Sequence, residues 1–475
     1  MAKKKLAQAT AFQLAYEKVM GIAAVILIFF HMFISFARHY FAPENNMGAS
    51  PTVMMLLKID RWFALALVVG FVAYLAITKL RFPATWYRIK DAFKRCVCKE
   101  SVMLIVLFVC YLLACAAQSK RYTNVFKVAD LWLLDAFLCC LILFPMANLI
   151  GYRKMKKIIE FVLHAVALLT TGYIAWALWN VFHLHILTLP NGLQVGMTDK
   201  YTFYPGVNQN IASAIGTTMV LISLYMIVSQ RWFIRIPYAV AFVLHLYATL
   251  LTDSRAGFVA LLVAIPLTAF MIVWTKTAKS KTVKRIIFSC LAALAAAAVM
   301  LWLRKGVFTI FDSVTHLSEY TGKTKKVGSL VKDTGRFRLW IASIHSMFSS
   351  AQRFFFGTPI SLIPEMLQET KIELFGAGSL LAHAHNMILQ TGLVTGVPGM
   401  IAFVAFLVMM AIRCVKVGIG KAKADFPGAF ILPISILAMV IVNMFEPFLL
   451  FYLSLMGCVF FLFCGWIAAI DRGNE

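Results

Sequence analysis

The chain has 475 residues, of which 61% are hydrophobic and only 14% are charged, and its mean hydropathy is +0.83. About a quarter of the residues in a soluble domain are charged, so this chain has too few charges to cover a surface exposed to water. The composition therefore predicts a polytopic membrane protein and excludes collagen-like, disordered and disulfide-scaffold proteins. The net charge of +25 lies in short segments between apolar stretches, without zinc-finger spacing or an RNA-binding aromatic motif, and does not indicate nucleic-acid binding.

The N-terminal segment carries Lys3, Lys4 and Lys5 and lacks the small-residue cleavage site of a signal peptide. It predicts a cytoplasmic tail ahead of a retained first helix. The 10 cysteines lie in apolar stretches or in loops that we expect on the cytoplasmic side. Because none falls in an expected outer loop, no structural disulfide is predicted.

About twelve apolar stretches are long enough to cross the hydrocarbon core as helices, which requires about 20 mostly apolar residues each. They are residues 18–37, 62–79, 101–118, 130–150, 158–182, 209–229, 232–250, 255–274, 285–303, 384–411, 427–444 and 447–470. The tenth contains Gly392, Gly396 and Gly399 and is expected to be kinked or broken. The sequence thus predicts an all-α integral membrane protein with about 12 transmembrane helices.

The distribution of basic residues predicts the orientation. With the N-terminus in the cytoplasm, the tails and the loops expected inside hold more than half of the 45 Lys and Arg residues. This asymmetry favours an even number of spans and two cytoplasmic termini. Residues 1–303 then form the first nine helices, residues 304–383 form one long extracytoplasmic loop, and residues 384–475 form the last three helices and the cytoplasmic C-terminus.

The long loop is expected to contain an amphipathic helix that lies at the membrane interface. Bulky apolar side chains recur there at helical spacing, at Phe337, Trp340, Ile341, Ile344 and Phe348. Arg336, Arg338 and His345 fall on the opposite side of this pattern.

The sequence lacks the motifs of metal-dependent and nucleotide-driven enzymes. It has no DxD pair and no HExxH helix, and Leu317 stands where a phosphate-binding loop ending in Gly322-Lys323-Thr324 needs its first glycine. We therefore predict no metal site and no cofactor. The remaining candidates are polar residues at the expected outer ends of the spans, where a charged group is costly and indicates function.

Two kinds of charged candidate emerge, each with a structural alternative. Arg255 suits the bidentate binding of a phosphate, or it is an interfacial arginine paired with Asp253. Arg336 and Arg338 suit the same anion, or they form the basic face of the interfacial helix.

His385 has the side chain best suited to a general base near neutral pH, or it is a polar cap at a helix start. His383, two residues away, is expected to point elsewhere. Asn208 and Asn210 precede the sixth span and are either helix caps or sugar-binding residues.

Three stretches in this order resemble the O-antigen ligase and Wzy-type polymerase superfamily of bacterial membrane glycosyltransferases. They are Thr252-Asp253-Ser254-Arg255-Ala256-Gly257, then Gly335-Arg336-Phe337-Arg338-Leu339-Trp340, and then His385-Asn386-Met387-Ile388-Leu389-Gln390. The resemblance covers roughly residues 205–450, and the five N-terminal spans match only as generic helices.

The resemblance implies transfer of a glycan from a polyprenyl diphosphate carrier to an acceptor hydroxyl, in O-antigen-type or capsule-type polysaccharide assembly. The partners would be this lipid-linked donor, a glycan or glycolipid acceptor, and the bilayer of the bacterial inner membrane, with the site on its extracytoplasmic face. Polymerase and ligase activity both remain open. By similarity, His385 is the base, Arg255 and Arg336 bind the diphosphate with Arg338 as the alternative, and the residues expected to contact the glycan are Asn208, Asn210 and Asn386.

Elementary chemistry is consistent with these roles. A diphosphate leaves as a stable anion, so a single base suffices and arginines can replace a metal ion at the leaving group. The expected reaction is inverting and independent of metals. A flippase or transporter of lipid-linked sugars is the alternative, but such a protein should carry charged residues at mid-membrane depth, whereas the candidates here lie toward the outer side.

Overall fold

A computed structural model of the chain describes residues 97–118, 128–188, 194–197, 203–205, 208–316, 335–376, 383–419, 428–451 and 454–473, together with scattered positions between 18 and 94. These parts are mostly helical, and seven of their helices are long and apolar enough to cross a membrane. The molecule is therefore a helical membrane protein. The first two expected spans lie largely outside the described residues, so the total of twelve remains a prediction.

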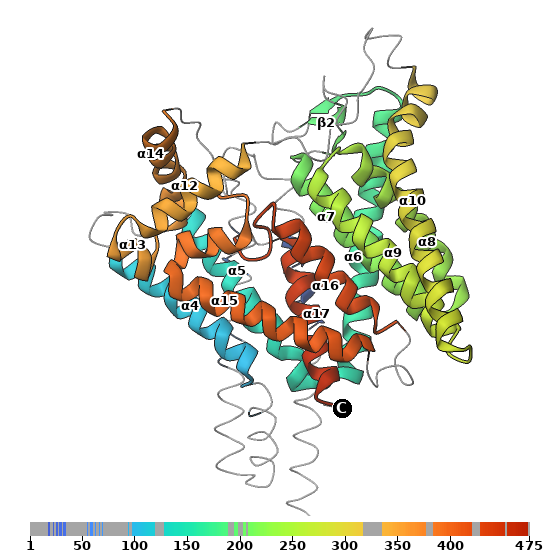
Figure 1. Ribbon diagram of the computed structural model, residues 1–475, viewed down its shortest axis with the longest axis horizontal. Helices are drawn as coiled ribbons and strands as arrows, with labels where there is room; N and C mark the ends of the chain where they lie inside the picture. The colour runs from blue at the N-terminus through green and yellow to red at the C-terminus, as the bar shows by residue number, and fades with distance from the viewer. Residues whose placement is uncertain are drawn as a thin grey trace, which may run out of the picture.

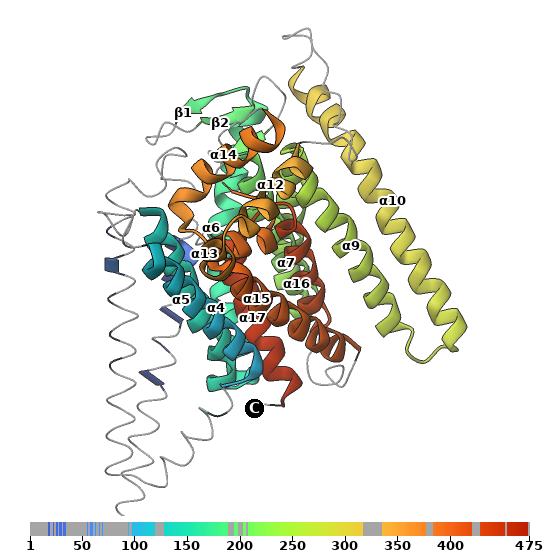
Figure 2. The same cartoon turned by 60° about the vertical axis from the view of Figure 1, so that its left-hand side comes forward.

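The helices form one bundle (Figures 1 and 2). Every expected span from the third onward overlaps a helix of the bundle. These helices are α4 (Lys99–Gln118), α5 (Val128–Ile150), α6 (Tyr152–Phe182), α7 (Gln209–Ser229), α8 (Trp232–Leu251), α9 (Arg255–Lys276), α10 (Thr282–Thr315), α15 (Met387–Ile419), α16 (Ile431–Asn443) and α17 (Leu455–Asp471).

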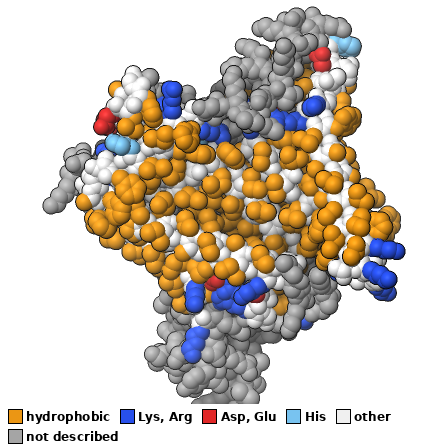
Figure 3. Space-filling model, in the orientation of Figure 1, with side chains coloured by type: hydrophobic (Ala, Val, Ile, Leu, Met, Phe, Trp, Pro, Cys, Tyr) orange, Lys and Arg blue, Asp and Glu red, His pale blue; other side chains and the backbone are white. Residues whose placement is uncertain are grey.

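The surface pattern is that of a protein surrounded by lipid. Hydrophobic side chains cover the middle of the face seen in Figure 3, and Lys and Arg side chains gather toward its two ends. Large apolar side chains such as Leu168, Leu294 and Trp302 are exposed, which water would penalise and hydrocarbon does not.

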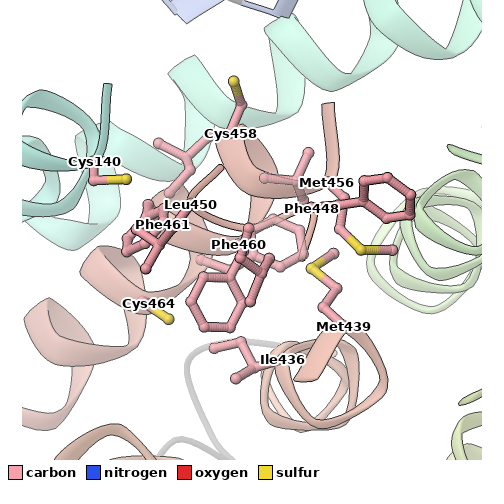
Figure 4. Packing of buried hydrophobic residues seen from close by; sticks show 14 of the residues in the cluster. Cys140, Ile436, Met439, Phe448, Leu450, Met456, Cys458, Phe460, Phe461 and Cys464 are labelled. Carbon is pink, nitrogen blue, oxygen red and sulfur yellow. The ribbon is translucent and has the colours of Figure 1, made fainter. Parts of the chain in front are cut away.

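The core lies where α17 packs against α5, α15 and α16. α17 is buried along nearly its whole length. Figure 4 shows part of this core, in which Phe448, Phe460 and Phe461 pack with Met439, Met456 and Ile436. The eight cysteines that the structure describes are all free.

Small residues let α7 lie close to its two neighbours. A Cβ atom at Gly216 would collide with Thr249 of α8, and one at Gly257 of α9 would collide with Ser213 of α7. Without side chains at these positions the backbones approach each other, as is common between membrane helices. Gly257 therefore fixes the start of α9, where Arg255 stands, against α7, the most buried of the seven long helices.

The expected break in the tenth span is confirmed. Gly396 interrupts α15 with φ 72° and ψ 174°, and Pro398 follows two residues later. The end of α13 (Ala351–Phe356) presses against this break, because a Cβ atom at Gly396 would lie 2.7 Å from the carbonyl oxygen of Phe354. Gly357 meets Gly396 from the other side, at φ 68°. Only glycine tolerates both the close contact and the positive φ at these two positions.

A small sheet that the sequence analysis did not predict lies between α6 and α7. Its antiparallel strands are β1 (Leu187–Thr188), β2 (Gln194–Met197) and β3 (Phe203–Pro205), in the order β1-β2-β3. Tyr173 of α6 donates a hydrogen bond to the carbonyl oxygen of Pro205 at 2.8 Å, which ties the sheet to the bundle.

Part of the expected long loop, residues 304–383, is helical. α10 continues to Thr315, past the expected span end at residue 303. The segment then contains α12 (Arg336–Phe348), α13, a short 3-10 turn (Ile360–Leu362) and α14 (Ile363–Phe375). α12 matches the predicted amphipathic helix. Its buried face consists largely of small side chains, among them Ala342, Ser343 and Ser346, which pack toward α14 and α15.

Candidate functional site

Glu446 is the centre of a buried polar group at the end of the bundle that also carries α12, α14 and the sheet, called here the site end (Figure 1). Its side chain is only 2% exposed. Arg336 donates from Nη2 to Oε1 at 2.8 Å, and Asn210 donates from Nδ2 to the same oxygen at 2.9 Å. His385 Nδ1 lies 3.0 Å from both carboxylate oxygens.

Hydrogen bonds hold the turn between α16 and α17 that presents Glu446. Asn443, the last residue of α16, accepts a hydrogen bond from the backbone N–H of Leu449 at 2.9 Å. Asn386 donates from Nδ2 to the carbonyl oxygen of Met444 at 3.2 Å. The turn is thus fixed to α16 and to the start of α15, so the carboxylate and His385 are held in one frame.

His385 and His383 precede the first turn of α15. His385 has a left-handed backbone, with φ 49°, and its N–H donates to His383 Nδ1 at 3.2 Å. The two ring centroids are 4.1 Å apart, and His383 Nε2 lies 3.9 Å from Glu446 Oε2. The expectation that His383 points elsewhere is therefore wrong, because helical periodicity does not apply before the helix begins.

The contacts favour one tautomer of each histidine. With Glu446 ionised, His385 donates from Nδ1, so Nε2 carries the lone pair that can accept a proton. His383 accepts the backbone N–H on Nδ1, so its ring proton resides on Nε2. Burial, followed by repulsion from Arg336 and from His385 when that ring is protonated, holds the pKa of His383 well below its usual value, so this ring is neutral near pH 7.

His383, His385 and Glu446 are also a possible metal-binding group, since their ligand atoms all lie within 4.8 Å of one another. Two contacts argue against metal binding by these three residues. The guanidinium of Arg336 already neutralises Glu446, and the Nε2 proton of His383 blocks the lone pair that a metal would need. The arrangement fits a hydrogen-bonded histidine–carboxylate pair better than a metal centre.

The structure separates the two arginines of α12. Arg336 is the first residue of the helix, contacts Glu446 and lies 5.8 Å above the ring of Phe445. Arg338 instead lies 5.8 Å from the ring centroid of Phe375 on α14. Of the pair, Arg336 is the one in the site.

Arg255 is the first residue of α9 and follows a turn in which Asp253 has φ 54°. Ser254 donates to Oδ1 of Asn210 at 3.3 Å, and Asn210 in turn contacts Glu446, so this turn is linked to the carboxylate. Arg304 of α10 supports the turn from the other side, with Nη2 3.7 Å from Asp253 Oδ1. No sequence pattern singled out Arg304.

The three asparagines have different roles in the structure. Asn208 caps α7 by accepting from the backbone N–H of Asn210 at 2.9 Å. Asn386 caps α15, accepting from the N–H groups of Ile388 and Leu389. The structure thus brings Asn210, Arg336 and His385 together around Glu446 and links the turn before Arg255 to Asn210. It places Asn208, Asn386 and Arg338 in local structural contacts.

Glu446 is the central residue of the candidate site, and the sequence patterns did not single it out. It is the only acidic residue between Asp425 and Asp471, within a strongly apolar stretch. An isolated carboxylate in such a stretch is a signal of function in membrane proteins. Its partners are 61, 110 and 236 positions away in sequence, so the contacts themselves could not be predicted.

Residues 240–404 match the protein-family model described as O-antigen ligase. No curated protein matched the chain. The matched region contains Arg255, Arg336 and His385, and it ends inside α15, before Glu446. With the helical membrane architecture and the order of the three stretches, this match supports the similarity of the chain to the O-antigen ligase and Wzy-type family.

Proposed function

We propose that this protein is a glycosyltransferase of the bacterial inner membrane that transfers a glycan from a polyprenyl diphosphate carrier to an acceptor hydroxyl. It would act as a polymerase or a ligase in surface polysaccharide assembly. The observation that carries the proposal is the contact of His385 and Arg336 with one buried carboxylate, Glu446. The family match supports a glycosyltransferase-type enzyme at the general level.

The donor diphosphate would bind to Arg255 and Arg336. A guanidinium has five N–H donors, so Arg336 can contact Glu446 and still offer hydrogen bonds to phosphate oxygens. Positive charges placed where the leaving group gains negative charge stabilise the transition state without a metal ion.

His385 would act as the base. The acceptor hydroxyl gives its proton to His385 Nε2, and its oxygen attacks the anomeric carbon on the side opposite the diphosphate. The bond from that carbon to the phosphate oxygen breaks, and polyprenyl diphosphate leaves with both electrons. The configuration at the anomeric carbon is inverted.

Glu446 would position His385 and stabilise the imidazolium that forms. A carboxylate on Nδ1 fixes the tautomer and ring orientation of a catalytic histidine, as in serine hydrolases. Because Glu446 also contacts Arg336, the base and the diphosphate-binding arginine share one support.

The experiment is product analysis with the purified protein, a lipid-linked oligosaccharide and candidate acceptors, with EDTA present and no nucleotide sugar. We expect a lengthened or acceptor-linked glycan and free polyprenyl diphosphate, and neither with His385→Ala. Movement of intact donor across vesicles without any new glycosidic bond would instead indicate a flippase.

A further inference from the structure

α12 has an apolar face that the rest of the described structure leaves exposed. The residues of this face, called here the α12 stripe, are Phe337, Ile341, Ile344 and Phe348, with Phe337 at 65% exposure. They recur every three or four positions and therefore lie along one side of the helix. The opposite side, with Leu339, Ala342 and Met347, is buried. The stripe is thus not needed to hold α12 in place.

The stripe begins at the candidate site. Phe337 follows directly on Arg336, whose guanidinium contacts Glu446. From Phe337 to Phe348 the helix rises about 16 Å. An extended apolar ligand lying on the stripe would therefore start beside the arginine that we assign to the diphosphate.

The stripe also leads to the lipid-facing surface. The rings of Phe348 and Phe354 are 5.4 Å apart, and Phe355 beside them is exposed. Phe354 and Phe355 belong to α13, which packs against α4. Gln352 of α13 donates a hydrogen bond to the carbonyl oxygen of Ala117 on α4 at 3.4 Å. α4 exposes a continuous set of apolar side chains: Val102, Ile105, Val106, Val109, Leu112 and Leu113.

From this continuity we propose that the α12 stripe, continued by Phe355, binds the diphosphate-proximal part of the donor's polyprenyl chain. The inference rests on the proposed function, since it assumes that the diphosphate is at Arg336. A branched hydrocarbon chain attached to a diphosphate matches an apolar track that starts at a cation. Contact with bulk lipid would not require an arginine at the start of the stripe. The arrangement therefore favours the donor as the ligand.

Donor chain length provides the test. Steady-state kinetics would be measured in detergent micelles with two donors that carry the same glycan diphosphate, one on a full-length polyprenyl chain and one on a geranyl group. The test variant is the double substitution Ile341→Ser and Ile344→Ser. Its matched control is Ile310→Ser and Val314→Ser, which removes two similarly exposed apolar side chains from the site end of α10.

We expect the test variant to raise KM for the long-chain donor about tenfold with little change in kcat, because apolar contact made in both ground and transition states is lost. KM for the geranyl donor should change less than about twofold, because that chain is too short to lie along the stripe. The control variant should match the parent protein with both donors.

Two results would overturn the proposal. If the test variant changed KM equally for both donors, the stripe would serve contact with bulk lipid or folding. If KM stayed unchanged for both donors, the stripe would have no role in donor binding. If the parent protein turns over either donor and His385→Ala does not, the proposed function holds even where the stripe proposal fails. If the parent turned over neither donor, both proposals would fall.

Discussion

Glu446 joins three side chains that come from α7, α12 and the approach to α15, and it does so from a nearly fully buried position. A buried carboxylate is costly unless charges and hydrogen bonds compensate it, and here a guanidinium, an amide and an imidazole all do so. Each of these groups therefore has a fixed place relative to the others. At the scale of residues, the site is an electrostatic unit, not a set of independent groups.

Glu446→Gln tests that unit. The amide keeps the shape of the side chain but removes the charge that fixes the His385 tautomer and stabilises the imidazolium, so turnover should fall by about two to four orders of magnitude. Donor affinity should change far less, because Arg336 keeps its charge. Separate measurement of kcat and donor affinity checks this. Turnover close to that of the parent would show that His385 needs no carboxylate.

Arg304 supports the turn that carries Arg255 and is 8% exposed. Arg304→Gln leaves Asp253 without this cation and loosens the turn, so donor KM should rise about tenfold or less, with a smaller effect than Arg255→Gln has. Arg304→Lys should restore part of the affinity. Equal losses for Arg304→Gln and Arg255→Gln would mean that Arg304 itself contacts the substrate.

At the scale of elements, the break in α15 is where α13 joins the long helices of the bundle. Thr358, just after Gly357, donates from its backbone N–H to the carbonyl oxygen of Leu393 at 2.7 Å. The first part of α15 carries the cap residue Asn386 next to His385, so the position of the base depends on this junction.

Gly396→Ala should destabilise the protein by about 2–4 kcal/mol, because a Cβ atom at φ 72° would collide with the carbonyl groups of α13. Gly306→Ala is the control, since Gly306 lies within α10 and has open space around it. That change should be neutral or slightly stabilising. Thermal unfolding in detergent would compare them, and similar melting temperatures for both variants would contradict a tight junction.

The elements differ in how far the sequence could predict them. Long apolar windows identified α4 to α10 and α15 to α17, and glycine content identified the break in α15. Helical spacing identified α12, whereas α13 and α14 were not predicted. The strands are two to four residues long and gave no periodic signal, although Asn191-Gly192 in that region is a typical hairpin sequence. Arg255, Arg336 and His385 followed from local motifs. The choice of Arg336 over Arg338 and the role of Glu446 depend on tertiary contacts that no local pattern carries.

At the scale of the whole molecule, polar groups are concentrated at two opposite ends of an apolar bundle (Figure 3). The end opposite the site holds an ion-pair network. Arg413 of α15 contacts Glu100 of α4 at 2.6 Å and Asp471 of α17 at 2.5 Å, and Arg472 contacts Glu100 at 3.2 Å. This network fixes three helices together at the end where the described chain stops.

The charge asymmetry of the sequence predicts that the site end faces away from the cytoplasm. A cysteine introduced at exposed Glu369 on α14 should react with a membrane-impermeant thiol reagent in intact cells, and one at exposed Lys281, in the turn before α10, should react only after lysis. The parent protein supplies the background labelling. The reverse pattern would place the site in the cytoplasm, away from an extracytoplasmic acceptor.

The most direct test of the account is turnover and donor affinity, measured separately, for His385→Ala and Arg336→Ala at matched expression. We expect His385→Ala to lower turnover by about two to four orders of magnitude and to leave donor affinity nearly unchanged. Arg336→Ala should weaken donor binding as well as turnover, because its charge is lost from the diphosphate. A His385→Ala variant that forms product at the parent rate would contradict the assignment of the base, and with it the proposed mechanism.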